Sequence, residues 1–157
     1  MRRTLVLALA LAAFACAKEP APEQTVDALF FGGTIVTMTA ATPAIEAVAV
    51  RDGRIVDMGA FKAMHDTHAG ALTRMIDLEG GALLPGTIDP AMAADVTGVL
   101  ATLAPGTAAS DRAIEVGKAA DFVIFNRNPL DAVAEESGEL RIMRIVRGGE
   151  TVFRAEH

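Results

Sequence analysis

The clearest structural signal in this chain is the stretch Ile45-Glu46-Ala47-Val48-Ala49-Val50-Arg51-Asp52-Gly53-Arg54-Ile55-Val56-Asp57-Met58. Two runs of apolar, β-favouring residues, 45–50 and 55–58, flank the Asp52-Gly53 pair. An Asp-Gly pair between such runs is a strong short-range signal for a β-hairpin. The stretch therefore predicts an antiparallel strand pair, and the turn alone explains Asp52 without a catalytic role.

Further strand signals lie on both sides of this hairpin. Residues 28–38 are β-favouring around Gly32-Gly33, which predicts a strand pair or a bent strand with a tight turn at the glycines. Residues 121–125 predict a single strand. Two more strand pairs are predicted around glycine-containing turns, namely residues 74–78 and 82–84 around Glu79-Gly80-Gly81, and residues 140–146 and 151–153 around Gly148-Gly149.

Two segments lack the strand pattern. Residues 61–68 predict a short helix or a loop. In residues 93–103, Ala, Met, Val and Leu recur at spacings of three and four, which predicts a helix that Pro105-Gly106 stops. Turn signals about every 8 to 12 residues favour a sandwich or an open barrel over a parallel sheet. The predicted fold is therefore mainly β, a small β-sandwich with one or two short helices.

Composition limits the classes of function. The chain has 157 residues, of which 52% are hydrophobic and 22% are charged, so it can bury the core of one compact domain. An enzyme barrel of roughly 250 residues does not fit into this length. The formal net charge is -6 and the chain has no Trp and no Tyr, whereas nucleic-acid binders gather Lys and Arg on one face and stack bases on aromatic rings. Nucleic acid is therefore not an expected partner.

The first residues are typical of an export signal. Met1-Arg2-Arg3 is basic, and residues 5–15 form an apolar run too short to span a bilayer. The run ends in Ala13-Phe14-Ala15-Cys16, which resembles a bacterial lipobox, where the cysteine is diacylated and becomes the new N-terminus. Ordinary cleavage after Ala15 or Ala17 is the alternative.

These residues lead to an expected location. We expect a signal peptide at residues 1–15, lipid attachment at Cys16 and a polar tether at residues 16–26, rich in Pro and Glu. The protein would then lie in the bacterial periplasm, with the membrane as a partner through its lipid anchor. Cys16 is the only cysteine, so no intrachain disulfide and no zinc-thiolate site are expected.

Three stretches together resemble the amidohydrolase superfamily. The first is residues 29–38 with the hairpin that follows. The second is Ile76-Asp77-Leu78-Glu79-Gly80-Gly81-Ala82-Leu83-Leu84-Pro85-Gly86-Thr87-Ile88-Asp89-Pro90, similar to the segment that leads into the first barrel strand of that family. The third is Ile114-Glu115-Val116-Gly117-Lys118-Ala119-Ala120-Asp121-Phe122-Val123-Ile124-Phe125, followed by Asn128-Pro129-Leu130, which resembles the family's C-terminal return. The chain is most similar to the amidohydrolase family 3 branch, which includes formamide deformylase-like and other exported proteins.

The resemblance implies a metal-dependent hydrolase of carbon-nitrogen bonds other than peptide bonds, with a TIM-like barrel and a composite β-sandwich built from both chain ends. In the family a His-x-His pair follows the Asp-Pro of the second stretch and holds a divalent metal such as zinc. The matching positions here are Ala91 and Ala93, whose methyl groups have no lone pair. The other family ligands lie in barrel strands that have no counterpart here. No catalytic residue, metal ligand or cofactor is therefore carried over to this chain.

The resemblance also implies a division of the chain. Residues 27–90 and 110–157 match the N-terminal and C-terminal parts of the composite sandwich, and residues 91–109 resemble the last barrel helix. Such a helix normally packs on barrel strands, so here its apolar face must find another surface or stay exposed. Instability or self-association is therefore expected.

Other candidate sites have simpler interpretations. His65 and His68 could share a helix face with Asp66 and bind a metal, but a solvated helix explains them, because two flexible imidazoles do not supply a shaped metal site. Asp89 is interpreted as a hydrogen-bond acceptor at a turn or strand end. No histidine accompanies Ser110-Asp111 at a useful spacing, so a Ser-His-Asp arrangement has no support.

Three functions remain open at this point. The first is a non-catalytic, exported remnant of an amidohydrolase, truncated and inactive on its own. The second is an exported β-sandwich lipoprotein that serves as a binding or scaffolding module. The third is half of a split metal-dependent hydrolase, in which a partner chain supplies the barrel.

Overall fold

The structure is a computed structural model that describes residues 25–103, 112–131 and 139–156, and all structural statements refer to these residues. None of the helices in these ranges has the length and apolar character needed to cross a membrane. In chain order the elements are β1 (Ala28–Phe31), β2 (Thr34–Val36), β3 (Ala44–Ile45), β4 (Ala47–Arg51), β5 (Arg54–Gly59), α1 (Phe61–His68), β6 (Arg74–Asp77), β7 (Ala82–Pro85), the 3-10 helix η1 (Pro90–Met92), α2 (Val96–Leu103), β8 (Phe122–Phe125), β9 (Ile142–Arg147) and β10 (Glu150–Arg154).

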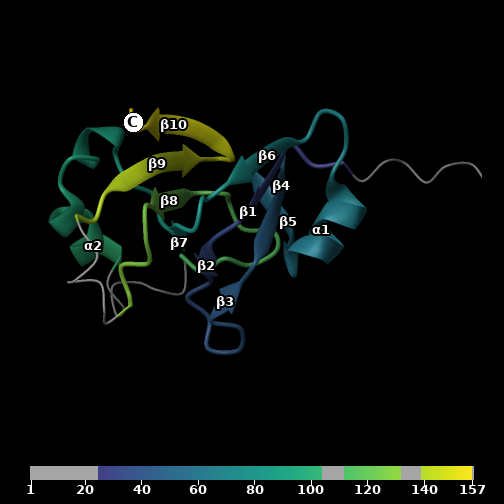
Figure 1. Cartoon of the computed structure of the whole chain (residues 1–157), viewed down its shortest axis with the longest axis horizontal. Helices are drawn as coiled ribbons and strands as arrows, with labels where there is room; N and C mark the ends of the chain where they lie inside the picture. Colours follow the sequence, from purple (N-terminus) through teal and green to yellow (C-terminus); the bar gives the residue numbers. More distant parts are fainter. Residues whose placement is uncertain (1–24, 104–111, 132–138, 157) are drawn as a thin grey trace, which may run out of the picture.

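The strands form two sheets that pack on each other. One sheet has the order β5-β4-β1-β6 and the other has the order β10-β9-β8-β7-β2-β3. α1 lies against the four-stranded sheet, and α2 lies at the other end of the molecule beside the six-stranded sheet (Figure 1). The prediction of a small, mainly β sandwich with short helices and no closed barrel is confirmed for the described part of the chain.

Two of the predicted hairpins are present and one is wrong. β4 and β5 pair antiparallel across Asp52-Gly53, and β9 and β10 pair antiparallel across Gly148-Gly149. The strands around Glu79-Gly80-Gly81 do not pair with each other, because β6 belongs to the four-stranded sheet and β7 to the six-stranded sheet. The strands on either side of Gly32-Gly33 are likewise divided between the two sheets, so of the two predicted forms the bent strand is the one observed.

The chain instead crosses from the four-stranded to the six-stranded sheet twice, along parallel paths. β1 pairs parallel with β6 before the crossing, and β2 pairs parallel with β7 after it. Backbone hydrogen bonds connect the two crossings, including Gly80 N–H to Gly32 O (2.7 Å) and Thr34 N–H to Gly81 O (2.9 Å). Gly33 allows this close approach, because a Cβ at this position would lie 2.3 Å from Gly81 O. Each crossing ties the two sheets together.

The main core lies between the two sheets. Phe30 of β1 and Phe122 of β8 meet edge to face, with their ring centroids 5.3 Å apart. Both side chains are fully buried. Around them pack the other inward-facing residues of both sheets and of the loop before β8: Ala28, Ile35, Val48, Val50, Ile55, Ile76, Leu78, Leu83, Ile114, Ala120, Ile124 and Val146.

Each sheet also has a covered outer face. Along β1, Leu29 points away from the central core and packs with Met64 of α1. Along β8, Val123 and Phe125 pack with Val99 of α2. These central strands are buried on both faces, which is why their sequences are continuous apolar runs rather than alternating patterns.

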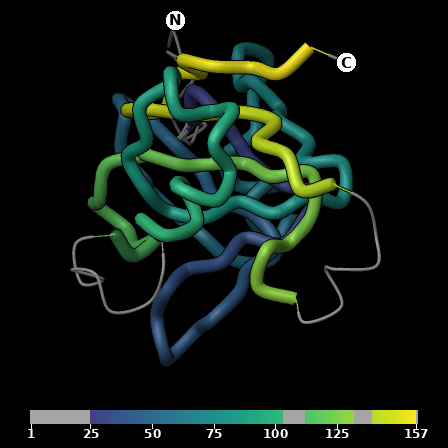
Figure 2. The backbone as a smooth tube through the Cα atoms, turned by 90° about the vertical axis from the view of Figure 1, so that its left-hand side faces the viewer, coloured from purple at the N-terminus to yellow at the C-terminus, as the bar shows by residue number. Residues whose placement is uncertain are grey.

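The two helices are close to their predicted places. α1 covers residues 61–68, and α2 begins at Val96 rather than at residue 93, because residues 90–92 form the 3-10 helix η1. In Figure 2, which looks at the molecule from the α2 side, this segment lies in front of the six-stranded sheet. Val99 is fully buried there, and Val96 and Leu100 are partly buried. The apolar face of this helix therefore packs on the sheet of its own chain.

Candidate functional site

Ala91 and Ala93, the positions that the sequence resemblance likened to a His-x-His pair, lie on a tight helical turn. Ala91 is within η1, and Ala93 ends it. Asp89 caps the turn, because its Oδ1 accepts a hydrogen bond from the N–H of Ala91 at 2.9 Å, which confirms the acceptor role expected for Asp89. On a strand, residues two apart share a face, but on a 3-10 helix with three residues per turn they point about 120° apart. Positions 91 and 93 therefore do not present two side chains to one metal.

A largely apolar groove of about 390 Å³ runs beside this turn. Its only charged lining residues are Glu139 and Arg141, which form an ion pair of 2.9 Å with each other. The remaining lining residues come from η1, the start of α2 and the β9–β10 hairpin: Pro90, Ala91, Ala93, Ala94, Val96, Leu140, Ile142, Phe153 and Ala155. The two charged side chains of this lining thus contact each other, and its other described residues are apolar.

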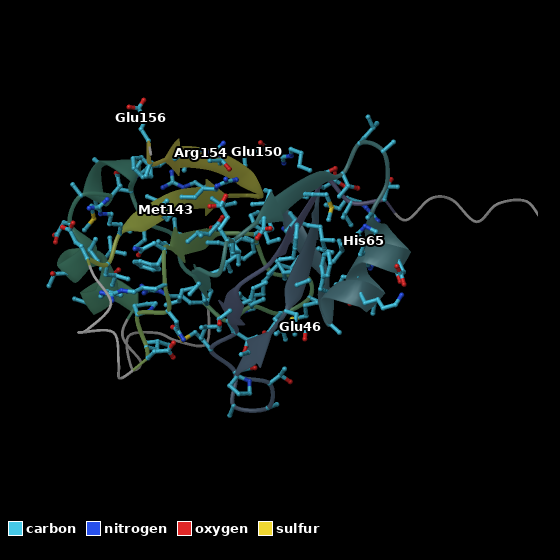
Figure 3. The ribbon with its side chains drawn as sticks, viewed as in Figure 1. Glu46, His65, Met143, Glu150, Arg154 and Glu156 are labelled. Carbon is cyan, nitrogen blue, oxygen red and sulfur yellow. The ribbon has the colours of Figure 1, made fainter. Side chains whose placement is uncertain are left out.

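The histidines of α1 are separated by the helix rather than brought together. His65 lies on the outside of α1 (Figure 3), half exposed, with Nδ1 3.5 Å from Asp66 Oδ1. His68 is buried, and its Nε2 lies 2.8 Å from Asp57 Oδ2 on β5. The prediction of a solvated helix therefore holds for His65 and is wrong for His68, which fixes α1 to the sheet. Within the described ranges, no three His, Cys, Asp or Glu side chains converge as metal ligands would.

The acidic residue next to His65 is already engaged. Lys62 Nζ lies 2.5 Å from Asp66 Oδ2, one helical turn away. This hydrogen bond, together with a weaker one from His65, lowers the pKa of Asp66. It also raises the pKa of Lys62. Both groups are fully exposed, so the pair is a surface contact and not the centre of a site.

Asp121, within the third family-like stretch, has a structural role. Its Oδ1 accepts a hydrogen bond from the N–H of Gly148 at 2.7 Å, and its Oδ2 accepts one from Thr87 Oγ1 at 2.8 Å. The carboxylate therefore joins the start of β8 to the β9–β10 turn and to the loop after β7.

Sequence reasoning missed a pair of arginines on the β9–β10 hairpin. Arg144 and Arg154 are directly opposite each other in the sheet and line a cavity of about 110 Å³. Burial, and then the nearby charge of Arg154, lower the pKa of Arg144. The signal in the sequence is their placement on either side of Gly148-Gly149. This signal does not predict that the two arginines face each other, because an irregularity near Val152 shifts the pairing of β9 with β10.

Several predicted features lie outside the described residues. These are the leader and its cleavage site, Cys16, most of the tether, Ser110, Asp111 and the Pro105-Gly106 stop that follows α2. For them the sequence-based expectations remain predictions.

The comparisons with known proteins give a distant structural similarity. No family model matches the sequence, and a search of curated proteins finds no match. Among solved structures, the chain is similar to a protein from Bacillus thuringiensis at 29% identity, over 41% of this chain and 85% of that chain, with a TM-score of 0.37.

Two enzymes are also among the similar structures. One is enamidase, described as a member of the amidohydrolase superfamily, at 28% identity over 40% of this chain, with a TM-score of 0.32. The other is N-acyl-D-glutamate deacylase from Bordetella bronchiseptica, solved with zinc and a phosphonate inhibitor, at 26% identity over 46% of this chain, with a TM-score of 0.32. The aligned part spans only 16% and 15% of these two enzymes.

Proposed function

We propose that this chain is an amidohydrolase-type β-sandwich that lacks the catalytic barrel and does not hydrolyse carbon-nitrogen bonds on its own. The observation that carries the proposal is the path of the chain after β7. Where the family motif continues with two histidines, Asp89 caps a 3-10 helix with alanines at both positions. From there the chain enters α2 within a few residues.

The packing of α2 supports the same conclusion. Val99 is fully buried against the outer face of the six-stranded sheet, together with Val123 and Phe125 of β8. Burial of such side chains contributes roughly 1.5–3 kcal/mol each. A partner chain that supplied barrel strands to this helix would have to compete with that packing. The arrangement therefore favours a sandwich that folds alone over half of a split enzyme.

The test is to measure zinc content and hydrolytic activity on the purified protein, against simple formamides and N-acyl amino acids. We expect neither stoichiometric zinc nor metal-dependent turnover. The double variant Ala91→His/Ala93→His tests the geometry of this turn. We expect it to bind no zinc tightly, because the two imidazoles would project about 120° apart from a 3-10 helix. Turnover in the unchanged protein that disappears with a chelator would overturn the proposal. Tight zinc binding by the double variant would show that this segment can adopt the strand geometry of the family.

We further propose that the protein is exported and held on a membrane through a lipid on Cys16. The support is the basic start, the short apolar run and the Ala13-Phe14-Ala15-Cys16 ending of the leader. We expect the protein in the membrane fraction, with an N-terminal mass that includes the lipid, and we expect Cys16→Ser to abolish both. A mature N-terminus at Lys18, or an unmodified Cys16 thiol, would instead establish ordinary cleavage.

A binding role is the second candidate function. The observation that favours it is the cavity lined by Arg144 and Arg154. Their guanidinium groups have no ion-pair partner among the described residues, so they are suited to hold an anionic group.

A further inference from the structure

The pairing of β9 with β10 places two arginines side by side. Next to the turn, Glu150 is opposite Arg147 and Thr151 is opposite Val146. The pairing then shifts, so that Arg154 is directly opposite Arg144. Directly opposed residues of neighbouring strands project to the same face, and like charges in such positions destabilise the sheet. Figure 3 shows Arg154 on this hairpin together with Met143, the neighbour of Arg144.

A cavity of about 110 Å³ lies between this hairpin and the turn after β6. Leu78 and Ile124, both buried, and the partly buried Met143 supply its apolar part. Its polar lining has both signs of charge, Arg144 and Arg154 on the hairpin and Asp77 and Glu79 on the turn, with the amide of Asn126. At about 30 Å³ per water molecule, this space suits a ligand of only a few non-hydrogen atoms.

The two arginines have no carboxylate partner within the described ranges. Arg74 and Arg141 each form an ion pair of 2.9 Å, but among the described residues no salt bridge within 4.0 Å and no side-chain hydrogen bond involves Arg144 or Arg154.

The acidic residues of the cavity lie at the end of β6 and in the turn that follows it. Asp77 Oδ1 accepts a hydrogen bond from the N–H of Glu79 at 2.8 Å, which orients that carboxylate along the turn. Glu79 acts on Arg144 only through its charge, which partly offsets the lowering of the Arg144 pKa by burial and by Arg154. A bound carboxylate would offset both the burial of Arg144 and its repulsion by Arg154.

We propose that this cavity binds a small α-amino acid, with its carboxylate on Arg144 and Arg154 and its ammonium group facing Asp77 and Glu79. The guanidinium groups can each donate two parallel hydrogen bonds to a carboxylate. The two carboxylates of the lining repel a dianion and attract a cationic group, so a zwitterion matches the charges better than phosphate or acetate. The apolar side accepts hydrogen or a methyl group at the amino acid's side-chain position.

The test is a titration of the purified protein with glycine, followed by NMR at the Arg Nε–H groups and at the methyl group of Met143. We expect saturable shifts of Arg144, Arg154 and Met143, with a dissociation constant in the millimolar range. At matched ionic strength, acetate binds more weakly and methylammonium does not bind. Arg144→Gln and Arg154→Gln each weaken glycine binding by about tenfold or more, because each removes a charge-assisted pair. Arg141→Gln, which changes an arginine directly before β9 and outside the cavity, leaves binding unchanged.

Folding of the variants is checked by thermal unfolding. Arg154→Gln removes a like charge opposite Arg144, so we expect the ligand-free variant to melt at the same temperature as the parent or higher, which separates lost binding from lost structure. Glycine should raise the melting temperature of the parent but not of the variant. Absence of saturable shifts, or equal shifts in both glutamine variants, would overturn the site. Acetate binding as tight as that of glycine would overturn the assignment of an amino acid. None of these outcomes bears on whether the chain hydrolyses amides.

Discussion

Phe30→Ala is expected to lower the free energy of unfolding by about 3–5 kcal/mol, the range for truncation of a buried phenylalanine. Phe30 is fully buried and meets Phe122 across the two sheets at 5.3 Å between ring centroids. Truncation would remove this contact and leave a void in the core that joins the sheets. Since small domains have only about 5–15 kcal/mol of total stability, a large part of it would be lost. Denaturant unfolding followed by circular dichroism measures the change.

Phe31→Ala is the matched control, because it makes the same change one residue further along the same strand. Phe31 points to the opposite face, is only partly buried and stacks on Phe61 of α1 at 4.6 Å. We expect a cost of about 1–2 kcal/mol, since less apolar surface returns to water. If the two variants were equally destabilised, or if Phe31→Ala were the more damaging, the central core would not lie between the sheets as described.

Gly33→Ala is expected to be strongly destabilising. An added Cβ would lie 2.3 Å from Gly81 O and 2.8 Å from Leu78 Cβ. The first of these atoms belongs to the backbone of the neighbouring crossing and cannot rotate away. The crossings would have to separate, with loss of the Thr34 to Gly81 hydrogen bond, and we expect a cost on the order of 3 kcal/mol. The melting temperature and the denaturant midpoint report the change.

Gly80→Ala separates the steric effect from backbone strain. Gly80 has a positive φ of 79°, but no atom lies within 4 Å of its added Cβ. The alanine variant should therefore lose only about 1 kcal/mol, from the left-handed backbone conformation. A loss at Gly80 equal to that at Gly33 would mean that the close approach of the two crossings has no special cost.

Together these variants examine how the two sheets are held together. The sheets share one core through Phe30 and Phe122, and the chain passes from the four-stranded to the six-stranded sheet at two adjacent crossings. α1 and α2 pack on the outer faces of the two sheets.

The elements that could be predicted depend on local signals. Asp52-Gly53 and Gly148-Gly149 terminate hairpins whose two strands are neighbours in sequence, and the turn chemistry determines such pairs. The acceptor role of Asp89 is equally local, because the carboxylate binds a backbone N–H two residues ahead.

The register of the arginine pair could not be predicted in this way. A regular hairpin that starts from the Glu150–Arg147 pair would place Phe153 opposite Arg144, and Arg154 opposite Met143. The shift between Thr151 and Phe153 moves Arg154 opposite Arg144 instead, and it lets Phe153 pack towards the α2 side. Packing of the whole sheet decides such an irregularity, and the residues of the hairpin do not specify it.

The sequence by itself determined that this protein is mainly β and where most strands and both helices lie. Only the tertiary structure decided that β1 pairs with β6 and β2 with β7, that α2 packs on the six-stranded sheet, and that Arg144 meets Arg154 beside a cavity. The physical reason is that turns and strands depend on neighbouring residues, whereas parallel pairing and sheet packing depend on contacts between distant segments.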